Sequence, residues 1–186
     1  MKVTTTGLAG ILVIEPKVFA DNRGFFMESY NRRTLAPYGI TLDFVQDNHS
    51  ASTRNTLRGL HYQIKPGQDK LVRCVNGSVL DVVVDIRRGS PTFGQWESFL
   101  LSAENKKMVY VPKGFAHGFC VLSDYAEFLY KCTEYWSPQD ERGIAWDDPA
   151  IGIDWQLTGE PVLSGKDRVN PLLRDADLWF EAGINS

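Results

Sequence analysis

The stretch Lys70–Ile86, KLVRCVNGSVLDVVVDI, decides the fold of this chain. Runs of apolar and β-branched residues flank Asn76-Gly77, a dipeptide that strongly favours a hairpin turn. Alternation divides residues 79–85 between two faces, one with Val79, Asp81, Val83 and Asp85 and the other with Leu80, Val82 and Val84. We therefore expect strands at residues 70–75 and 78–86, joined as a hairpin.

Short strands separated by turn residues continue on both sides of this stretch. They are expected at residues 11–14, 25–30, 57–64, 95–101, 107–111, 115–122 and 126–136. A turn is expected at 21–24, a short helix at 31–38 and a polar loop at 50–55. From about residue 137 the alternation ends and an irregular tail follows. This pattern is typical of a mainly β protein, and we expect a double-sheet sandwich or barrel with a few short helices, in one domain of residues 1–186.

The composition is typical of a globular protein that does not bind nucleic acid. Of 186 residues, 43% are hydrophobic and 23% are charged, which suffices for a substantial core. The net charge of −3 argues against a nucleic-acid partner, because phosphate backbones require a basic surface. We expect neither a signal peptide nor a membrane span, since no apolar run is suitable. The cysteines, Cys74, Cys120 and Cys132, are expected to be reduced thiols of a cytoplasmic protein.

The hexapeptide at residues 58–63, RGLHYQ, is the first candidate for chemistry. His61 suits proton transfer near neutral pH, and Arg58 and Lys70 would stabilise a negative charge that develops beside it. The competing interpretation is a core histidine next to a surface arginine. Strand alternation places Arg58, Leu60 and Tyr62 on one face and Gly59, His61 and Gln63 on the other.

A second candidate is the stretch at residues 112–119, PKGFAHGF, which carries His117. It resembles the second half of the cupin signature, and cupins are jelly-roll barrels that hold a ligand in an open mouth. Metal-binding cupins carry His-x-His in the first half, where this chain has His61-Tyr62-Gln63. Two histidines and a carboxylate would still suit iron or zinc. Since Arg58 and Lys70 would repel a dication and favour an anion, we expect no metal.

Two further positions have both a functional and a structural interpretation. Tyr130 and Trp136 share strand parity, so a phenol and an indole would both face a pocket if that face lines the barrel. The structural alternative for Tyr130 is a buried aromatic residue in a strand. Composition alone indicates that residues 163–167, with Lys166 and Asp167, form a solvated loop.

Taken in order, nearly the whole chain resembles the dTDP-4-dehydrorhamnose 3,5-epimerase family. The matching blocks are residues 19–26 (FADNRGFF), 44–50 (FVQDNHS), 57–63 (LRGLHYQ), 70–73 (KLVR), 81–86 (DVVVDI), 90–94 (SPTFG), 101–105 (LSAEN), 112–119 (PKGFAHGF) and 127–131 (EFLYK). The resemblance implies that the chain inverts the two sugar carbons beside the keto group of dTDP-4-dehydro-6-deoxy-D-glucose, without a cofactor or metal, on the way to dTDP-L-rhamnose.

The resemblance assigns catalytic roles to five residues. His61 would remove the proton α to the carbonyl, and Asp167 would orient its imidazole. Lys70 and Arg58 would stabilise the enolate oxygen. Tyr130 would return a proton from the opposite face. One departure from the family pattern is Asp69, whose carboxylate we expect beside Lys70, where it would weaken this cation.

The resemblance also implies how the substrate and a second subunit bind. Arg23, Arg58 and Lys166 would contact the diphosphate, and Trp136 would stack on thymine. The other positions at which the family binds the dTDP-sugar are Glu28, Gln46, Asp47, Asn48, Lys70, His117 and Glu141. The family is homodimeric, with an amino-terminal segment that completes the partner's sheet and site. Three alternatives stay open: a 3-epimerase of a related deoxysugar, a silent sugar-nucleotide-binding cupin and a metal-dependent cupin oxygenase.

Overall fold

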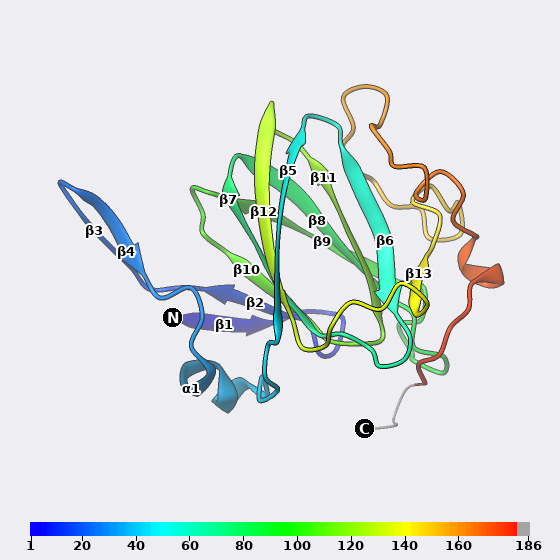
Figure 1. The fold of residues 1–186 in the computed structure, drawn as a ribbon, viewed down its shortest axis with the longest axis horizontal. Coiled ribbons are helices and arrows are strands. Elements are labelled where there is room, and N and C mark those ends of the chain that lie inside the picture. The colour runs from blue at the N-terminus through cyan, green and yellow to red at the C-terminus, as the bar shows by residue number, and fades with distance from the viewer. Residues whose placement is uncertain (182–186) are drawn as a thin grey trace.

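The computed structural model describes residues 1–181, and its regular secondary structure consists almost entirely of strands (Figure 1). The first half contains β1 (Lys2–Thr5), β2 (Leu12–Glu15), β3 (Val18–Asp21), β4 (Gly24–Met27), α1 (Arg32–Leu35), η1 (Ala36–Tyr38), β5 (Gln46–Thr53), β6 (Leu57–Gln63), β7 (Lys70–Asn76) and β8 (Ser78–Asp85). The second half contains β9 (Trp96–Ser102), β10 (Met108–Val111), β11 (Phe115–Val121), β12 (Tyr125–Cys132), β13 (Glu141–Gly143) and η2 (Leu173–Asp175).

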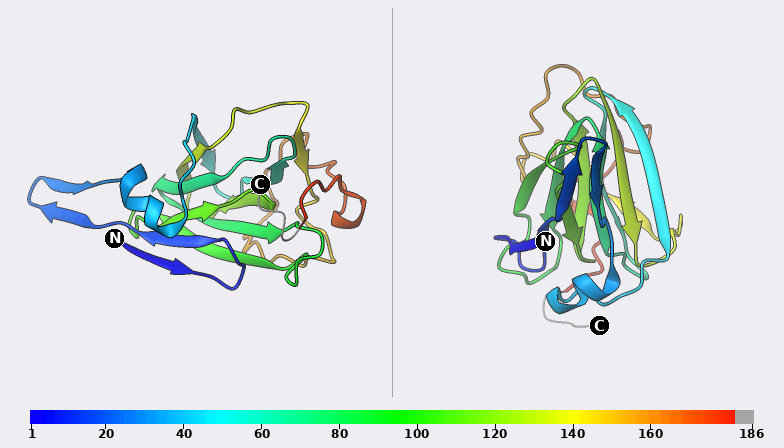
Figure 2. Two further views of the ribbon diagram at one scale, coloured as in Figure 1. Left: turned by 90° about the horizontal axis from the view of Figure 1, so that it is seen from below. Right: turned by 90° about the vertical axis from the view of Figure 1, so that its left-hand side faces the viewer.

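Two antiparallel sheets pack face to face, as the end-on view shows (Figure 2). The six-stranded sheet has the order β1-β2-β10-β7-β12-β5, and the five-stranded sheet has the order β13-β6-β11-β8-β9. The core between them draws on both sheets, with Val72, Val109 and Phe128 from one and Val83 and Phe119 from the other. The expected jelly-roll sandwich is therefore confirmed.

Each sheet also has a covered outer face. The tail packs Ile144, Ile151 and Trp155 against the outer face of the five-stranded sheet. Leu35 and Ile40, from and after the helical segment, cover the six-stranded sheet. The tail is irregular as expected, since β13 and η2 are its named elements within the described chain. In residues 1–181, no helix is long and apolar enough to cross a membrane.

The strand β8 has the two faces that its sequence predicts. Val79 and Val83 contribute to the core between the sheets. Leu80, Val82 and Val84 lie on the opposite face, under the tail. The alternation was therefore sufficient here, because both faces of this central strand are buried and the strand is regular.

The prediction of a hairpin at Asn76-Gly77 is wrong. The strands on either side, β7 and β8, belong to different sheets, so the two residues turn a corner of the sandwich. Gly77 has a φ of 68°, and a Cβ there would lie 2.1 Å from the Tyr125 carbonyl oxygen. The dipeptide supplies the left-handed conformation that a tight turn needs, but a turn does not decide which strands pair.

The predicted faces of β6 hold for residues 60–63 and are wrong for Arg58. Opposite β11, His61 pairs with His117 and Arg58 pairs with Phe119, so the register shifts by one residue between them. This irregularity turns Arg58 to the face of His61, whereas Leu60 packs under the tail. It lies at Gly59, where a Cβ would come within 2.6 Å of the Gly118 Cα. Only glycine permits this close approach.

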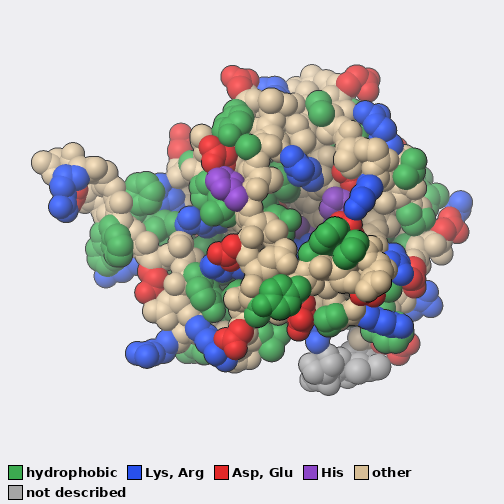
Figure 3. Space-filling model, viewed as in Figure 1, with side chains coloured by type: hydrophobic (Ala, Val, Ile, Leu, Met, Phe, Trp, Pro, Cys, Tyr) green, Lys and Arg blue, Asp and Glu red, His purple; other side chains and the backbone are tan. Residues whose placement is uncertain are grey.

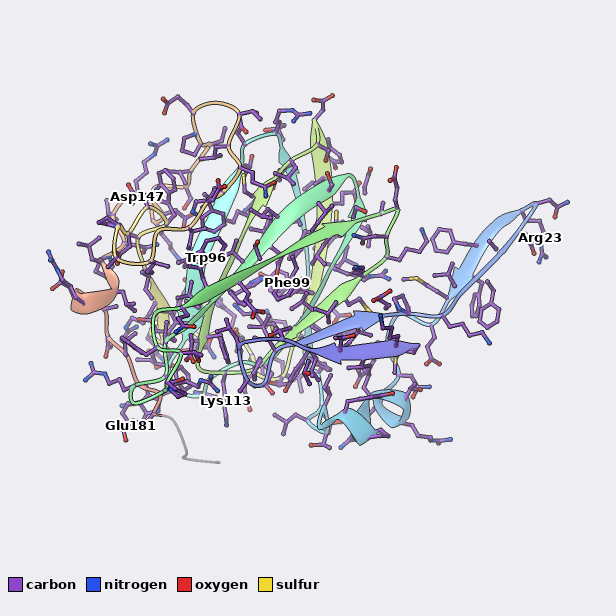
Figure 4. All side chains as sticks on the ribbon, turned by 180° about the vertical axis from the view of Figure 1, so that it is seen from behind. Arg23, Trp96, Phe99, Lys113, Asp147 and Glu181 are labelled. Atoms are coloured by element: carbon purple, nitrogen blue, oxygen red, sulfur yellow. The ribbon has the colours of Figure 1, made fainter. Side chains whose placement is uncertain are left out.

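The paired strands β3 and β4 extend away from the sandwich as a hairpin, with Arg23 at its outer end (Figure 4). Its turn is at residues 21–24 as expected, although β4 ends at Met27. Phe19, Phe25 and Phe26 are 53, 60 and 70% exposed, respectively. The hairpin thus carries a large apolar surface that its own chain leaves open.

Two local predictions around β5 have opposite outcomes. The helix expected at 31–38 is present as α1 and η1, with the Asn31 side chain capping its first turn. The polar loop expected at 50–55 is wrong for residues 50–53, which belong to β5 and pair with β12. These residues are polar because β5 is an edge strand of its sheet.

Candidate functional site

A cavity of about 490 Å³ opens between the two sheets. Its lining is Gln46, Asn48, His61, Tyr62, Gln63, Gln68, Lys70, Tyr130, Cys132, Tyr135, Trp136 and Glu141. The space-filling view shows the hollow between β5 and β6, with histidine inside and Lys or Arg beside it (Figure 3). Seven of the residues predicted for the site are thus brought together, from strands and loops far apart in the sequence.

His61 and Asp167 form a hydrogen-bonded pair. The His61 Nε2 lies 2.6 Å from an Asp167 carboxylate oxygen, and Ser164 Oγ donates to the other oxygen at 2.7 Å. Burial raises the pKa of Asp167, but the hydrogen bonds from His61 and Ser164 outweigh it and leave the pKa below its usual value. Asp167 is therefore a buried anion that holds the ring, and no residue among 1–181 forms a hydrogen bond with its Nδ1. The solvated loop suggested by composition is wrong for this residue.

Lys70 lies in the cavity wall, and the carboxylate of the preceding residue, Asp69, is bonded elsewhere. Burial lowers the pKa of Lys70, and the neighbouring Cys132, Asp81 and Glu141 raise it part of the way back. The expectation that Asp69 weakens this cation is wrong. The Asp69 side chain instead accepts hydrogen bonds from the Tyr110 hydroxyl and, at 2.9 Å, from the Lys113 backbone N–H.

Tyr130 faces the cavity from β12, opposite the sheet that carries His61. Burial raises the pKa of Tyr130, Cys132 adds to the rise, and the positive charge of Arg58 opposes it. The phenol is therefore protonated at neutral pH. Arg58 itself is exposed and donates to Ser52 Oγ at 3.1 Å, beside the lined cavity.

His117 is buried and does not belong to the cavity lining. It lies 2.7 Å from an Asp81 carboxylate oxygen and stacks on Phe128. The other Asp81 oxygen is buried without a hydrogen-bond donor. Burial raises the pKa of Asp81, while His117 and Lys70 lower it part of the way. His117 therefore supports the wall behind Lys70.

The remaining predicted residues divide between the rim and the outside. Lys166 pairs with Glu141 at 2.7 Å on the cavity rim, whereas Asp47 pairs with Lys131 at 2.9 Å. Arg23 pairs with Asp21 at the hairpin turn, far from its own cavity (Figure 4). Glu28 accepts from Asn31 at 2.9 Å and from Thr34 at 3.2 Å, at the start of α1. In residues 1–181, no group of three His, Cys, Asp or Glu side chains is placed to hold a metal ion.

Several lining residues were missed by the sequence analysis. Cys132 follows Tyr130 by two strand positions, and this parity was a usable signal. Gln63 lies two positions after His61 and had the same signal. Gln68 and Tyr135 lie in loops, where no period exists to show which way a side chain points.

Comparison with known proteins bears directly on this site. Residues 5–175 match the family model described as dTDP-4-dehydrorhamnose 3,5-epimerase. The dTDP-4-dehydrorhamnose 3,5-epimerase of Pseudomonas aeruginosa is 57% identical over 180 residues, which cover 96% of this chain and 99% of that protein.

Solved structures agree with the family model. The 3,5-epimerase of Legionella pneumophila, in complex with dTDP-4-keto-L-rhamnose, has a TM-score of 0.93 and 50% identity over 95% of this chain and 94% of its own. A 3'-monoepimerase from Streptomyces bikiniensis, in complex with dTDP-quinovose, has a TM-score of 0.85 and 38% identity over 91% of this chain and 86% of its own. On these matches, the chain belongs to the dTDP-4-dehydrorhamnose 3,5-epimerase family.

Proposed function

We propose that this chain epimerises dTDP-4-dehydro-6-deoxy-D-glucose at carbons 3 and 5 and so makes dTDP-4-dehydro-L-rhamnose for dTDP-L-rhamnose biosynthesis. The observation that carries the proposal is one cavity with His61, bonded to Asp167 of the tail, on one sheet and Tyr130 on the facing sheet. Inversion beside a ketone needs a base and an acid on opposite faces of one carbon, and this arrangement supplies both.

The base half of the reaction is assigned to His61. Its Nε2 is occupied by Asp167, so Nδ1 takes the proton from the carbon α to the keto group. The electron pair of the broken C–H bond moves to the keto oxygen, and an enolate forms. Asp167 stabilises the imidazolium that results. Such a base contributes about 10²–10⁴ in rate.

Enolate stabilisation and reprotonation use the cationic and phenolic residues. Lys70, assisted by Arg58, stabilises the enolate oxygen. Loss of one such donor raises the activation free energy by about 3–4 kcal/mol. Tyr130 then donates its proton to the other face of the carbon. The pKa of Tyr130, raised by burial, keeps that proton available at neutral pH. Solvent then takes the proton from His61 and returns a proton to Tyr130, and the same two steps at the second carbon complete the double inversion.

Binding of the dTDP half is assigned to the rim. Arg58 and Lys166 suit the diphosphate, because charge-assisted hydrogen bonds to phosphate are strong. Trp136, on the rim and half-exposed, suits stacking on thymine. Gln46, Asn48 and Glu141 line the same cavity as Trp136.

We also propose a homodimer in which the amino-terminal segment of one protomer completes the partner's sheet and site. Support comes from the hairpin β3–β4, which carries exposed Phe19, Phe25 and Phe26 and the diphosphate candidate Arg23. A partner would cover that apolar surface and receive Arg23. A cytoplasmic location fits the three free, buried cysteines, which a reducing compartment maintains.

Solvent deuterium uptake tests the reaction. The protein is incubated with dTDP-4-dehydro-6-deoxy-D-glucose in heavy water, against an enzyme-free control. We expect two deuteriums, one at carbon 3 and one at carbon 5. Uptake at carbon 3 alone would support the second candidate, a 3-epimerase, which the similarity to the Streptomyces bikiniensis monoepimerase favours. No uptake above the control would overturn the catalytic proposal.

A further inference from the structure

The rim of the cavity carries a short irregular segment, residues 134–137, between β12 and β13. We call it the rim segment. Its aromatic side chains, Tyr135 and Trp136, are 69 and 53% exposed, yet both line the cavity. Exposed aromatic residues outside regular structure have little of their own to hold them in place. Something else must fix these two if they are to form a flat surface.

Three glutamine side chains hold the backbone of the rim segment. Gln68 Nε2 donates to the Glu134 carbonyl at 2.8 Å, and Gln63 Nε2 donates to the Tyr135 carbonyl at 3.2 Å. The Trp136 N–H donates to Gln46 Oε1 at 2.9 Å, and the Ser137 N–H donates to Gln63 Oε1 at 2.8 Å. Each of residues 134–137 thus has one backbone group hydrogen-bonded to a glutamine side chain.

The glutamines come from three parts of the fold. Gln46 begins β5, Gln63 ends β6 and Gln68 precedes β7, so the rim segment is tied to both sheets. Gln63 is the central member, since it is only 4% exposed and also donates to the Pro66 carbonyl at 2.9 Å. A primary amide both donates and accepts at one place, so a carboxylate of the same length cannot replace it.

We propose that Gln46, Gln63 and Gln68 are positioning residues that pre-organise Tyr135 and Trp136 as the platform for the nucleobase. The inference rests on the proposed function, which assigns the base to this end of the cavity. A platform held before binding spares the ligand the entropic cost of ordering it. The three amides therefore determine affinity for the nucleoside end of the substrate and leave the proton transfers unchanged.

Gln46 acquires a different role from the one that the resemblance assigns to it. Its Oε1 is taken by the Trp136 N–H, and its Nε2 donates to the Asn48 Oδ1 at 3.0 Å. Both ends of the amide are engaged within the protein. Gln46 thus acts on the substrate through Trp136 and Asn48.

The test is calorimetric titration of Gln63→Met with two probes, dTDP and inorganic pyrophosphate. Methionine keeps the length and volume of the side chain but removes its hydrogen bonds to the rim segment. We expect the Kd for dTDP to rise roughly tenfold, the effect of losing one to two hydrogen bonds. The Kd for pyrophosphate stays within about twofold of wild type, and kcat stays within about twofold while KM rises with Kd.

A double-mutant cycle with Trp136→Ala separates positioning from general damage. In the Trp136→Ala background, Gln63→Met changes the Kd for dTDP by less than about twofold, because the ring assigned to stack on thymine is already absent. Gln68→Met, which removes a single bond at the partly exposed rim, gives a smaller rise and serves if Gln63→Met does not fold. Gln139→Met, an exposed glutamine outside the cavity lining, is the matched control and leaves both affinities unchanged.

The outcomes separate this inference from the proposed function. Unchanged dTDP affinity in folded Gln63→Met or Gln68→Met would overturn the glutamine inference while wild-type deuterium uptake stands. An equal loss of dTDP and pyrophosphate affinity, or a loss of kcat alone, would overturn it too. A wild-type protein that binds dTDP without deuterium uptake would overturn the catalytic proposal and leave the glutamine inference to be decided by the titration.

Discussion

His61 and His117 are direct partners across β6 and β11, yet their surroundings differ. Each pairs with its own carboxylate, Asp167 or Asp81. The His61 side chain is partly exposed in the cavity, whereas His117 is buried. Only the imidazole with a free nitrogen on the cavity can exchange a proton with a substrate, so His61 alone is assigned as the base.

Replacing His61 by asparagine should separate chemistry from binding. The amide retains a donor for Asp167 but cannot take a proton, so we expect kcat to fall about 10²–10⁴-fold. Affinity for dTDP, measured by calorimetry, should stay close to wild type. Loss of dTDP binding together with turnover would show that His61 has a structural role instead.

Replacing Asp81 by asparagine should change the pH profile on its alkaline side. Burial lowers the pKa of Lys70, and the charge of Asp81 raises it, so removing that charge lowers the pKa further. Lys70 then loses its proton at a lower pH, and the alkaline limb of kcat/KM should move to lower pH. Asp43→Asn, at an exposed residue paired with Arg32, is the control. An unmoved alkaline limb would show that Asp81 does not act on Lys70.

At the residue scale, sequence reasoning reached those site residues whose chemistry or family motif is local. His61, Lys70 and Tyr130 sit in strands with recognisable neighbours. Asp167 lies 106 positions after its partner His61, in a tail without periodicity. Composition alone assigned it to a solvated loop, and the family resemblance supplied the pairing. The role of the three glutamines in holding the rim segment was not predicted, because their partners there are backbone groups, which no sequence pattern marks.

Among the elements, regular strands were predicted well and irregular ones were not. Alternation gave the correct faces of β8 because this central strand is buried on both sides. In β6 it was correct for residues 60–63 but failed for Arg58, because the register shift at Gly59 reverses the parity of the residues before it. Asn76-Gly77 was read correctly as a turn and wrongly as a hairpin. Pairing depends on contacts between strands distant in sequence, which local turn chemistry does not contain.

The turn after β8 depends on Asp85, which we expect to stabilise the fold in a pH-dependent way. Its buried carboxylate accepts from Arg87 Nη2 at 2.7 Å and from Ser90 and Thr92 hydroxyls at 2.6 Å each. Burial raises the pKa of Asp85, but these hydrogen bonds outweigh it and hold the pKa below its ordinary value of 3.8.

Asp85→Asn should therefore destabilise the protein at pH 7 by about 3 kcal/mol, because Arg87 loses its ionic partner. A lowered folded-state pKa means that the stabilisation is complete above the ordinary value of 3.8 and is lost as pH falls through the folded-state value. Urea unfolding should show that the difference in unfolding free energy between wild type and variant shrinks as the pH falls below 3.8. A constant difference would argue against an ionised Asp85 as its source.

For the whole molecule, the exposed hairpin β3–β4 is the feature that a single chain leaves unexplained. Strand alternation predicted the sandwich, and the turn at 21–24 predicted a reversal there. Neither pattern showed that the hairpin extends away from the sandwich, because local sequence does not indicate which distant residues a hairpin packs against. Its exposed phenylalanines point to a partner surface.

Mixing two defective variants tests whether Arg23 serves the partner's site. His61→Asn and Arg23→Ala each impair a different component, and in the proposed homodimer a mixed dimer would have one site with both components intact. After unfolding and refolding together in equal amounts, the mixture should regain about a quarter of wild-type activity at subsaturating substrate. Arg23→Ala should show weakened substrate binding on its own. Activity equal to the sum of the separately refolded variants would place Arg23 outside the partner's site.

The close approach of Gly59 and Gly118 limits which substitutions these two positions tolerate. Any side chain at position 59 would meet the backbone at Gly118, and one at Gly118 would meet the Arg58 carbonyl oxygen at 2.7 Å. Relief requires β6 to move away from β11, and His61 moves with it. In a saturation screen scored by growth, both glycines should therefore look as intolerant as the histidine, although neither offers a side chain to the sugar.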